Sequence, residues 1–201
     1  MSRCGIVLLA AGSSSRLGRP KQLLSYHGRP LLQHTIDAIA ATTLTGPAVV
    51  VYGAHASAII PHIDHHTFHT VTNMYWAEGI ASSIRYGLSA IQALSPYISR
   101  VLFLLADQPF ITPSLLSAIT GTAVASPAGI IASHYDDAIG TPVLFHSKYF
   151  AALHDLNGDE GARKLIKNNM HDVHTVSFPM GHIDIDTIAQ YTSLAEQAAA
   201  I

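Results

Sequence analysis

The chain has 201 residues, of which 49% are hydrophobic and only 12% charged, with a formal net charge of -2. This length and composition allow one domain with a large core, and the near-neutral charge argues against nucleic-acid binding. The single cysteine, Cys4, excludes an internal disulfide framework and is typical of a reducing compartment. Because no apolar segment has the length of a signal peptide or a membrane span, we expect a cytoplasmic protein without membrane or nucleic-acid partners.

Short apolar runs alternate with helical patterns along the chain. The predicted strands are Ile6–Ala10, Ala48–Tyr52, Val101–Ala106, Gly129–Ala132, Pro142–Phe145 and Val173–Val176, with a weaker one near Thr67–Thr72. The predicted helices are Leu31–Ala41, His55–Ile63, Ile80–Leu94, Pro113–Ala123, Lys148–Leu153, Gly161–Asn168 and Thr187–Ala199. This alternation predicts one α/β domain over residues 1–201, Rossmann-like, with three α/β/α layers and a mostly parallel sheet. Ligands of such sheets bind at the carboxyl ends of the strands.

The first predicted strand runs directly into a loop of small and cationic residues, Gly12 to Lys21. Glycine and serine let the backbone approach a ligand, and successive free N–H groups can hold phosphate oxygens. Arg16, Arg19 and Lys21 add three cations to this loop. The combination indicates a nucleoside triphosphate site, although the loop is neither a Walker loop nor a GxGxxG turn.

This loop resembles the signature loop of the nucleotidyltransferases that activate sugars, isoprenoid precursors and molybdopterin. The family pattern L-A-A/G-G-x-S-x-R-x-G-x-x-K is matched at Leu9, Ala10, Ala11, Gly12, Ser13, Ser15, Arg16, Gly18 and Lys21. The resemblance implies that all of these except Gly18 bind the nucleotide. It also implies catalytic roles for Arg16 and Lys21, which would hold the β- and γ-phosphates.

Five histidines follow within one stretch of the chain: His55, His62, His65, His66 and His69. Zinc sites usually add cysteine or a carboxylate, and only Asp64 could contribute one here. We therefore expect solvated loop histidines in preference to a metal site.

The segment Asn73–Ser83 is similar to N-x-x-W-x-x-G-x-x-x-S of the molybdopterin branch of the family. Gly79 would let a loop approach a ligand, and the helix that follows presents free N–H groups and hydroxyls in its first turn. Nucleotide contacts are therefore predicted for Gly79, Ser82 and Ser83. The alternative for Ser83 is a capping or solvent-facing role.

Asp107 stands at the carboxyl end of the predicted strand Val101–Ala106. It would lie near the Gly12 loop if the two strands are close, and a carboxylate beside a triphosphate is most often a magnesium ligand. The alternative is a turn or capping aspartate. The family's D-x-P motif resembles Asp107-Gln108-Pro109, which implies a catalytic, metal-binding Asp107.

The segment Asp184-Ile185-Asp186-Thr187 is similar to the family's D-I-D-T, which implies that Asp186 is the second Mg²⁺ carboxylate. The alternative for Asp186 is a helix N-cap, a role that Thr187 or Asp184 could also fill.

Two later motifs resemble the part of the family that handles the acceptor: G-x-P-x-L-F from Gly140 to Phe145, and G-D-E-G-A-R from Gly158 to Arg163. The resemblance implies acceptor-binding roles for Gly140, Pro142, Asp159 and Arg163. From the residues alone, Asp159 is also a plausible N-cap and Arg163 a plain exposed cation.

The chain is thereby identified as a molybdenum cofactor cytidylyltransferase-like member of the MobA-like NTP transferases, which have the nucleotide-diphospho-sugar transferase fold. The resemblance implies transfer of CMP from CTP to the phosphate of molybdopterin with Mg²⁺ and release of pyrophosphate, and a client molybdoenzyme or its chaperone as a partner. Ala11 stands where the guanylyl branch has glycine, so its methyl group predicts CTP over GTP. The alternatives are a guanylyltransferase, a cytidylyltransferase for sugar or isoprenoid phosphates, and a non-catalytic cofactor carrier.

Overall fold

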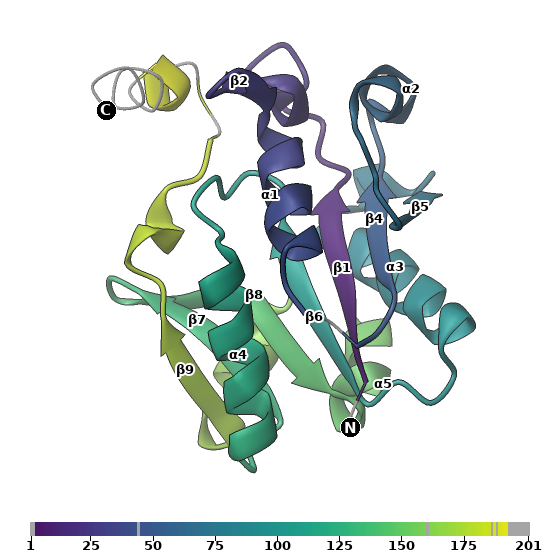
Figure 1. The fold of residues 1–201 in the computed structure, drawn as a ribbon. Coiled ribbons are helices and arrows are strands. Elements are labelled where there is room, and N and C mark those ends of the chain that lie inside the picture. The colour runs from purple at the N-terminus through teal and green to yellow at the C-terminus, as the bar shows by residue number, and fades with distance from the viewer. Residues whose placement is uncertain (1–2, 44, 160, 186, 188, 193–201) are drawn as a thin grey trace.

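The computed structural model describes residues 3–43, 45–159, 161–185, 187 and 189–192. Seven strands form one sheet in the order β5-β4-β1-β6-β8-β7-β9 (Figure 1). Their bounds are β1 Cys4–Ala10, β4 Ala48–Tyr52, β5 His69–Thr72, β6 Arg100–Leu105, β7 Ile130–Tyr135, β8 Ala138–His146 and β9 Val173–Ser177. All neighbours pair in parallel except β8, which runs antiparallel to β6 and to β7. The predicted mostly parallel sheet is confirmed.

Helices cover both faces of this sheet. Their bounds are α1 Leu31–Ala40, α2 Ala56–Ile59, α3 Ile80–Leu94, α4 Pro113–Ala125, α5 Phe150–His154 and α6 Arg163–Asn168. Ile6 and Leu8 of β1 pack in one cluster with residues of α1 and α4, whereas Val7 and Leu9 pack in a second cluster with residues of α3 and α6. Because both faces are covered, β1 is buried along its whole length, which explains its continuous apolar run. The three-layer α/β/α prediction is confirmed.

The hairpin of β7 and β8 is longer than the two short strands predicted there, Gly129–Ala132 and Pro142–Phe145. Ala132 pairs with Val143 but Ser133 pairs with Gly140, so that Thr141 and Pro142 form a bulge in β8. The Ser133 hydroxyl donates to the Pro142 carbonyl at 2.9 Å and holds this bulge. The bulge interrupts the alternation of apolar residues along β8. The sequence pattern therefore predicted only the regular end of this strand.

Two of the predicted helices are shorter by two residues or more in the structure. The helix predicted over His55–Ile63 is α2 followed by a 3₁₀ turn at Ile60–His62. The helix predicted from Gly161 begins only at Arg163, because Gly161 has φ +54° and lies outside helical geometry.

The predicted helix Thr187–Ala199 lies largely outside the described residues. Within them, the Thr187 hydroxyl accepts from the Gln190 N–H at 3.3 Å, and the Gln190 side chain accepts from the Thr187 N–H at 2.9 Å. These two bonds form a capping box, so Thr187 fills the N-cap role considered for it.

The C-terminal segment packs on the loop and hairpin that follow β1. Ile185 is fully buried with Leu17, Leu24 and Leu31. The Tyr191 hydroxyl donates to the carbonyl of Ser25, at 2.8 Å, in the short hairpin of β2 (Ser25–Tyr26) and β3 (Arg29–Pro30). The contacts join the end of the described chain to the segment that follows β1 (Figure 1).

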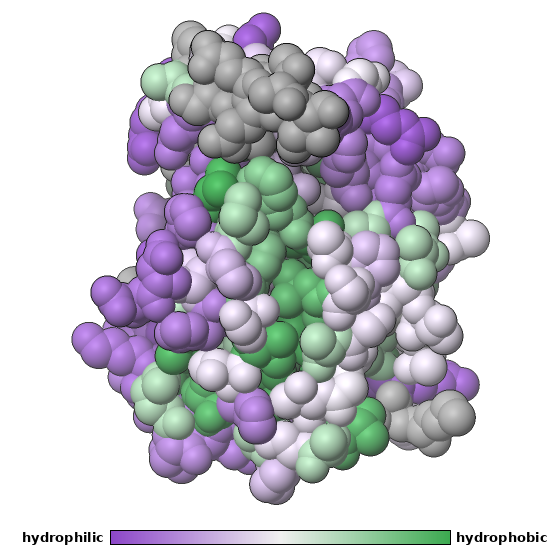
Figure 2. All heavy atoms as spheres, turned by 60° about the vertical axis from the view of Figure 1, so that its left-hand side comes forward, coloured by the Kyte–Doolittle hydropathy of each residue, from purple (hydrophilic) through white to green (hydrophobic). Residues whose placement is uncertain are grey.

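The surface on the side of α4 and β9 is mixed in character. Figure 2 shows apolar side chains running down the middle of this face, with hydrophilic side chains to their left and at the upper right. In the part of the chain that the structure describes, no helix has both the length and the apolar character of a membrane span.

Candidate active site at the carboxyl end of the sheet

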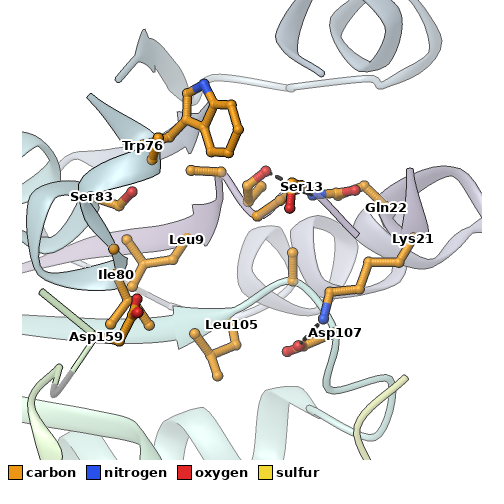
Figure 3. Close-up of a pocket in the computed structure, with 16 residues that line it drawn as sticks. Leu9, Ser13, Lys21, Gln22, Trp76, Ile80, Ser83, Leu105, Asp107 and Asp159 are labelled. Carbon is orange, nitrogen blue, oxygen red and sulfur yellow. Dashed lines mark hydrogen bonds and ion pairs between the residues drawn. The ribbon is translucent and has the colours of Figure 1, made fainter. Parts of the chain in front are cut away.

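A cavity of about 400 Å³ lies where the loops after β1 and β6 meet (Figure 3). The two strands are neighbours, with Leu9 beside Leu105, so the predicted proximity of the Gly12 loop and Asp107 is confirmed. Ten predicted site residues line the cavity: Leu9, Ala10, Ala11, Gly12, Ser13, Lys21, Gly79, Ser83, Asp107 and Asp159. Its volume lies within the range of about 300–1,000 Å³ that small-molecule sites occupy.

Lys21 and Asp107 face each other at one end of this cavity. Nζ of Lys21 lies 2.6 Å from Oδ2 of Asp107, and both side chains are 15% exposed. The other carboxylate oxygen, Oδ1, is buried and has no hydrogen-bond partner in the described part of the chain. An anionic oxygen of this kind is the ligand that Mg²⁺ prefers, so Asp107 fits a metal role.

The loop after β1 is held as a compact turn by Ser14. Its hydroxyl accepts from the Lys21 N–H at 3.0 Å, and its carbonyl accepts from the Leu17 N–H at 2.9 Å. Ser14 has φ +52°, a left-handed conformation that is uncommon outside glycine. Ser15 and Arg16, which were also predicted to bind nucleotide, are exposed on this loop and do not line the cavity.

Gln22 is a site residue that the sequence reasoning missed. Its side chain is almost fully buried, and Nε2 donates to the carbonyls of Ala10 and Gly12 at 2.8 and 3.3 Å. Gln22 thereby clamps the turn at the point where β1 becomes the loop. A glutamine directly before the apolar pair Leu23-Leu24 was the available signal. The other unpredicted lining residues are Trp76, Ala77, Ile80, Leu105 and Ala106.

Asn73 organises the start of α3. Its Nδ2 donates to the hydroxyls of Ser82 and Ser83 at 2.8 and 3.0 Å, and Asn73 is fully buried. The Ser82 hydroxyl is also within bonding distance of the carbonyls of Tyr75 and Gly79. Ser82 therefore holds the loop and does not line the cavity, whereas Ser83 does.

Gly79 has φ +101°, and a Cβ there would lie 2.5 Å from both the Gly158 carbonyl oxygen and Asp159 Oδ1. Only glycine tolerates this conformation and this contact. The Ala81 N–H donates to the Gly158 carbonyl at 3.1 Å, which fixes the 158–159 turn on α3 and brings Asp159 to the cavity. Ala162 is the N-cap of α6, so the alternative role considered for Asp159, as the cap of this helix, is wrong.

A second, smaller and more apolar cavity of about 190 Å³ adjoins the first and shares Leu9, Ile80, Leu105 and Asp159 with it. Of the residues predicted to bind the acceptor, Gly140, Asp159 and Arg163 line this cavity. Pro142 is buried in the β8 bulge and does not line it. A Cβ at Gly140 would lie 2.4 Å from the Tyr135 hydroxyl, so a larger residue there would have to displace the end of the Tyr135 side chain.

Three histidines of the 55–69 segment, His55, His65 and His66, have separate partners. His55 Nε2 bonds the Ser13 carbonyl at 2.8 Å, His65 bonds the Tyr52 hydroxyl at 2.7 Å, and His66 lies 3.1 Å from Asp37. Burial lowers the pKa of His65. Among the described residues no three His, Cys, Asp or Glu side chains are grouped as metal ligands, and Asp186 lies outside those residues.

The family model described as the MobA-like NTP transferase domain matches residues 6–174. Nicotine blue oxidoreductase from Paenarthrobacter nicotinovorans is 30% identical over 199 residues, 92% of each chain. The purine catabolism protein PucB from Bacillus subtilis is 28% identical over 194 residues, also 92% of each chain. The crystal structure of Rv0371c from Mycobacterium tuberculosis is 30% identical, with a TM-score of 0.84 over 97% of this chain and 98% of that one. A structure of Rv0371c in complex with manganese is 29% identical, with a TM-score of 0.80 over 97% and 99%.

Proposed function

This chain belongs to the MobA-like NTP transferase family, and from that membership we propose that it transfers the CMP part of CTP to the phosphate of molybdopterin. Pyrophosphate would be the second product, and a client molybdoenzyme or its chaperone would receive the first. The observation that carries the proposal is the placement of Lys21 and Asp107 together in a cavity that adjoins a second one.

The two cavities support separate places for the two substrates. In the proposal the triphosphate lies against the loop after β1, where Lys21 acts as a point charge on its oxygens and Arg16, exposed on this loop, would reach over to them as a fork. The smaller cavity takes the acceptor, with the Arg163 side chain as its cation. Asp159 lines both cavities and so stands where the two substrates would meet.

A metal ion fits the same site. The buried Oδ1 of Asp107 supports a role as a ligand, and the family pattern adds Asp186. Bound Mg²⁺ supplies neutralisation of triphosphate charge and a template for the reacting groups. The manganese complex of Rv0371c, a protein 29% identical to this one, favours a divalent metal in this proposal.

In the proposed reaction, an oxygen of the acceptor phosphate forms a bond to the α-phosphorus of CTP. The bond from that phosphorus to the oxygen bridging the α- and β-phosphates breaks, and pyrophosphate leaves with the electron pair. No general base is needed, because a phosphomonoester is largely dianionic at neutral pH. The chain's residues contribute position and charge, with Lys21 and Arg16 holding the leaving pyrophosphate.

The alternatives are GTP in place of CTP, a sugar or isoprenoid phosphate as acceptor, and a non-catalytic carrier. A redox function is a further candidate, because one relative 30% identical over 92% of this chain is named an oxidoreductase. Folds of one family can serve different chemistries, so the assay must separate these cases.

The test is pyrophosphate release from each of the four NTPs, with and without a molybdopterin-type acceptor. We expect release only with CTP and the pterin acceptor together. Pyrophosphate release with a sugar phosphate would show that the acceptor is not molybdopterin. Release with GTP would show that the nucleotide is not CTP. No release from any pairing, together with reduction of nicotine blue by this protein in the presence of an added electron donor, would contradict the proposal in favour of a redox enzyme.

A further inference from the structure

Trp76 is the single tryptophan of the chain. It lines the larger cavity on the side opposite Lys21 and Asp107 (Figure 3), and 37% of it is exposed. A large aromatic side chain that is half open to water loses part of the free energy that burial would provide. A ligand bound in the cavity would cover the exposed part of this ring.

Three adjacent strands bring Trp76 to this place. The chain leaves β1 at Ala11, β4 at Gly53 and β5 at the turn that carries Trp76, and these strands are neighbours in the sheet. A Cβ at Gly53 would lie 2.8 Å from the Trp76 Cβ and 2.5 Å from the Ala11 carbonyl oxygen. Because Gly53 has no side chain, Trp76 and Ala11 approach each other across it and form two walls of the cavity.

The backbone that carries Trp76 is fixed. The Tyr75 N–H donates to Oδ1 of the buried Asn73 at 2.8 Å, and the Ser82 hydroxyl lies 2.9 Å from the Tyr75 carbonyl. The Trp76 carbonyl accepts from the Gly79 N–H at 3.2 Å. The ring is thus presented on a rigid turn, which lowers the entropy cost of stacking a ligand on it.

We propose that Trp76 is the platform on which the base of the nucleotide stacks. This inference rests on the proposed function, since a triphosphate held at Lys21 directs the base toward the other end of the cavity. The acceptor does not compete for the ring, because Trp76 is absent from the described lining of the smaller cavity. Ser83 beside it accepts from Asn73 at 3.0 Å, so its hydroxyl hydrogen can be donated to the base.

Stacking on an aromatic ring supplies affinity without choosing the base, because every base has a π-face. Trp76 would therefore strengthen CTP and GTP binding alike, and the choice between them would rest on the Ala11 wall. The proposal therefore predicts that a change at Trp76 alters the affinity for both nucleotides equally, whereas a change at Ala11 alters the preference between them.

The first measurement is the emission of Trp76, which reports on this site alone because no other tryptophan is present. We expect CTP and CMP to change the emission in a saturable way, and inorganic tripolyphosphate to bind without changing it. If calorimetry shows that CTP binds but the emission of Trp76 does not change, the stacking proposal is wrong and the proposed nucleotidyltransferase function still stands. An equal change with tripolyphosphate would also overturn it. If no nucleoside triphosphate binds, the proposed function fails and this inference fails with it.

The second measurement uses variants. Trp76→Ala should raise the Kd for CTP and for GTP in parallel, by roughly 5- to 150-fold, and Trp76→Phe should restore most of the loss. Tyr75→Ala is the matched control, since Tyr75 is 57% exposed but does not line the cavity. An unchanged Kd in a Trp76→Ala protein that unfolds at the wild-type temperature would overturn the proposal.

Discussion

Nζ of Lys21 and Oδ2 of Asp107 lie 2.6 Å apart although 86 positions separate the two residues in the chain. This ion pair joins the loop after β1 to the loop after β6 at the carboxyl end of the sheet. Each side chain neutralises the other in the protein without substrates. A triphosphate and a divalent cation that bind in the cavity would break this ion pair. Lys21 would then contact the phosphate oxygens and Asp107 the metal ion. The first two predictions test the two halves of this pair.

Asp107→Ala should lower kcat for nucleotidyl transfer by at least ~100-fold, the scale lost when one preorganised charge-stabilising group is removed. Asp107→Asn should fall as far, because an amide keeps the shape but not the charge. The measurement is steady-state pyrophosphate release over a series of Mg²⁺ and Mn²⁺ concentrations. Turnover close to wild type in either folded variant would exclude Asp107 as a metal ligand.

Lys21→Ala should weaken NTP binding or turnover and leave the fold intact, because Lys21 lies at the end of the loop after β1, where the 3₁₀ turn Lys21–Leu23 begins. Lys21→Arg should rescue only in part, since a planar guanidinium and a compact ammonium place charge differently on phosphate. The control is Lys148→Ala, which breaks the 2.7 Å ion pair of Lys148 with Asp172 and lies outside the described lining of both cavities. Activity that survives in a destabilised Lys21→Ala protein would contradict the phosphate role.

Ala11→Gly should reduce the preference for CTP over GTP in kcat/KM. Ala11 lines the cavity and faces the Gly53–Trp76 contact, so removing its methyl group widens the space for a purine. One methyl group in a pocket is worth ~1–3 kcal/mol, or ~10- to 200-fold in specificity. The ratio of kcat/KM for CTP to kcat/KM for GTP should therefore decrease by a factor in that range. The check is the two kcat/KM values measured side by side. A wild-type enzyme that prefers GTP would refute the base assignment alone.

Asp172 gives a pH prediction for stability. Hydrogen bonds from Lys148 and Tyr149, and a further one from the Gly129 N–H, lower the pKa of Asp172 from 3.8 to about 2, against the opposing effect of burial. The unfolded chain binds this proton more readily, so the stabilisation is complete above about pH 4 and is lost as the pH falls from 4 to 2. Asp172→Asn should cost about 1–2 kcal/mol at pH 7, and the difference should shrink toward zero at pH 2. Urea unfolding at several pH values measures it, and a difference independent of pH would contradict the prediction.

The sequence predicted those parts of the fold and site that depend on local pattern. The run Ile6–Ala10 indicated a strand covered on both faces, and the structure buries β1 along its whole length. Asp107 could be placed because an apolar strand ends directly before it, and the pairing of β1 with β6 then brought it to Lys21.

The remaining features depend on contacts between distant segments, which local periodicity does not report. The antiparallel direction of β8 and its bulge at Thr141-Pro142 arise from pairing with β7 and β6. Gln22 became a clamp because the carbonyls of Ala10 and Gly12 turn toward it. The Gly53–Trp76 contact needs three strands to be placed side by side before it can be seen.

The position of β1 between β4 and β6 also has a consequence for biosynthesis. Cys4 of β1 pairs with Arg100 of β6, so β1 cannot complete its pairing until β6 has been translated. Until then one edge of a wholly apolar strand has unpaired N–H and C=O groups, which is a template for aggregation. A fragment ending before Arg100 would keep the signature loop, yet it would lack Asp107 and leave that edge open. A chain that carries β4 but not β6 would therefore leave this edge of β1 open to pairing with another chain.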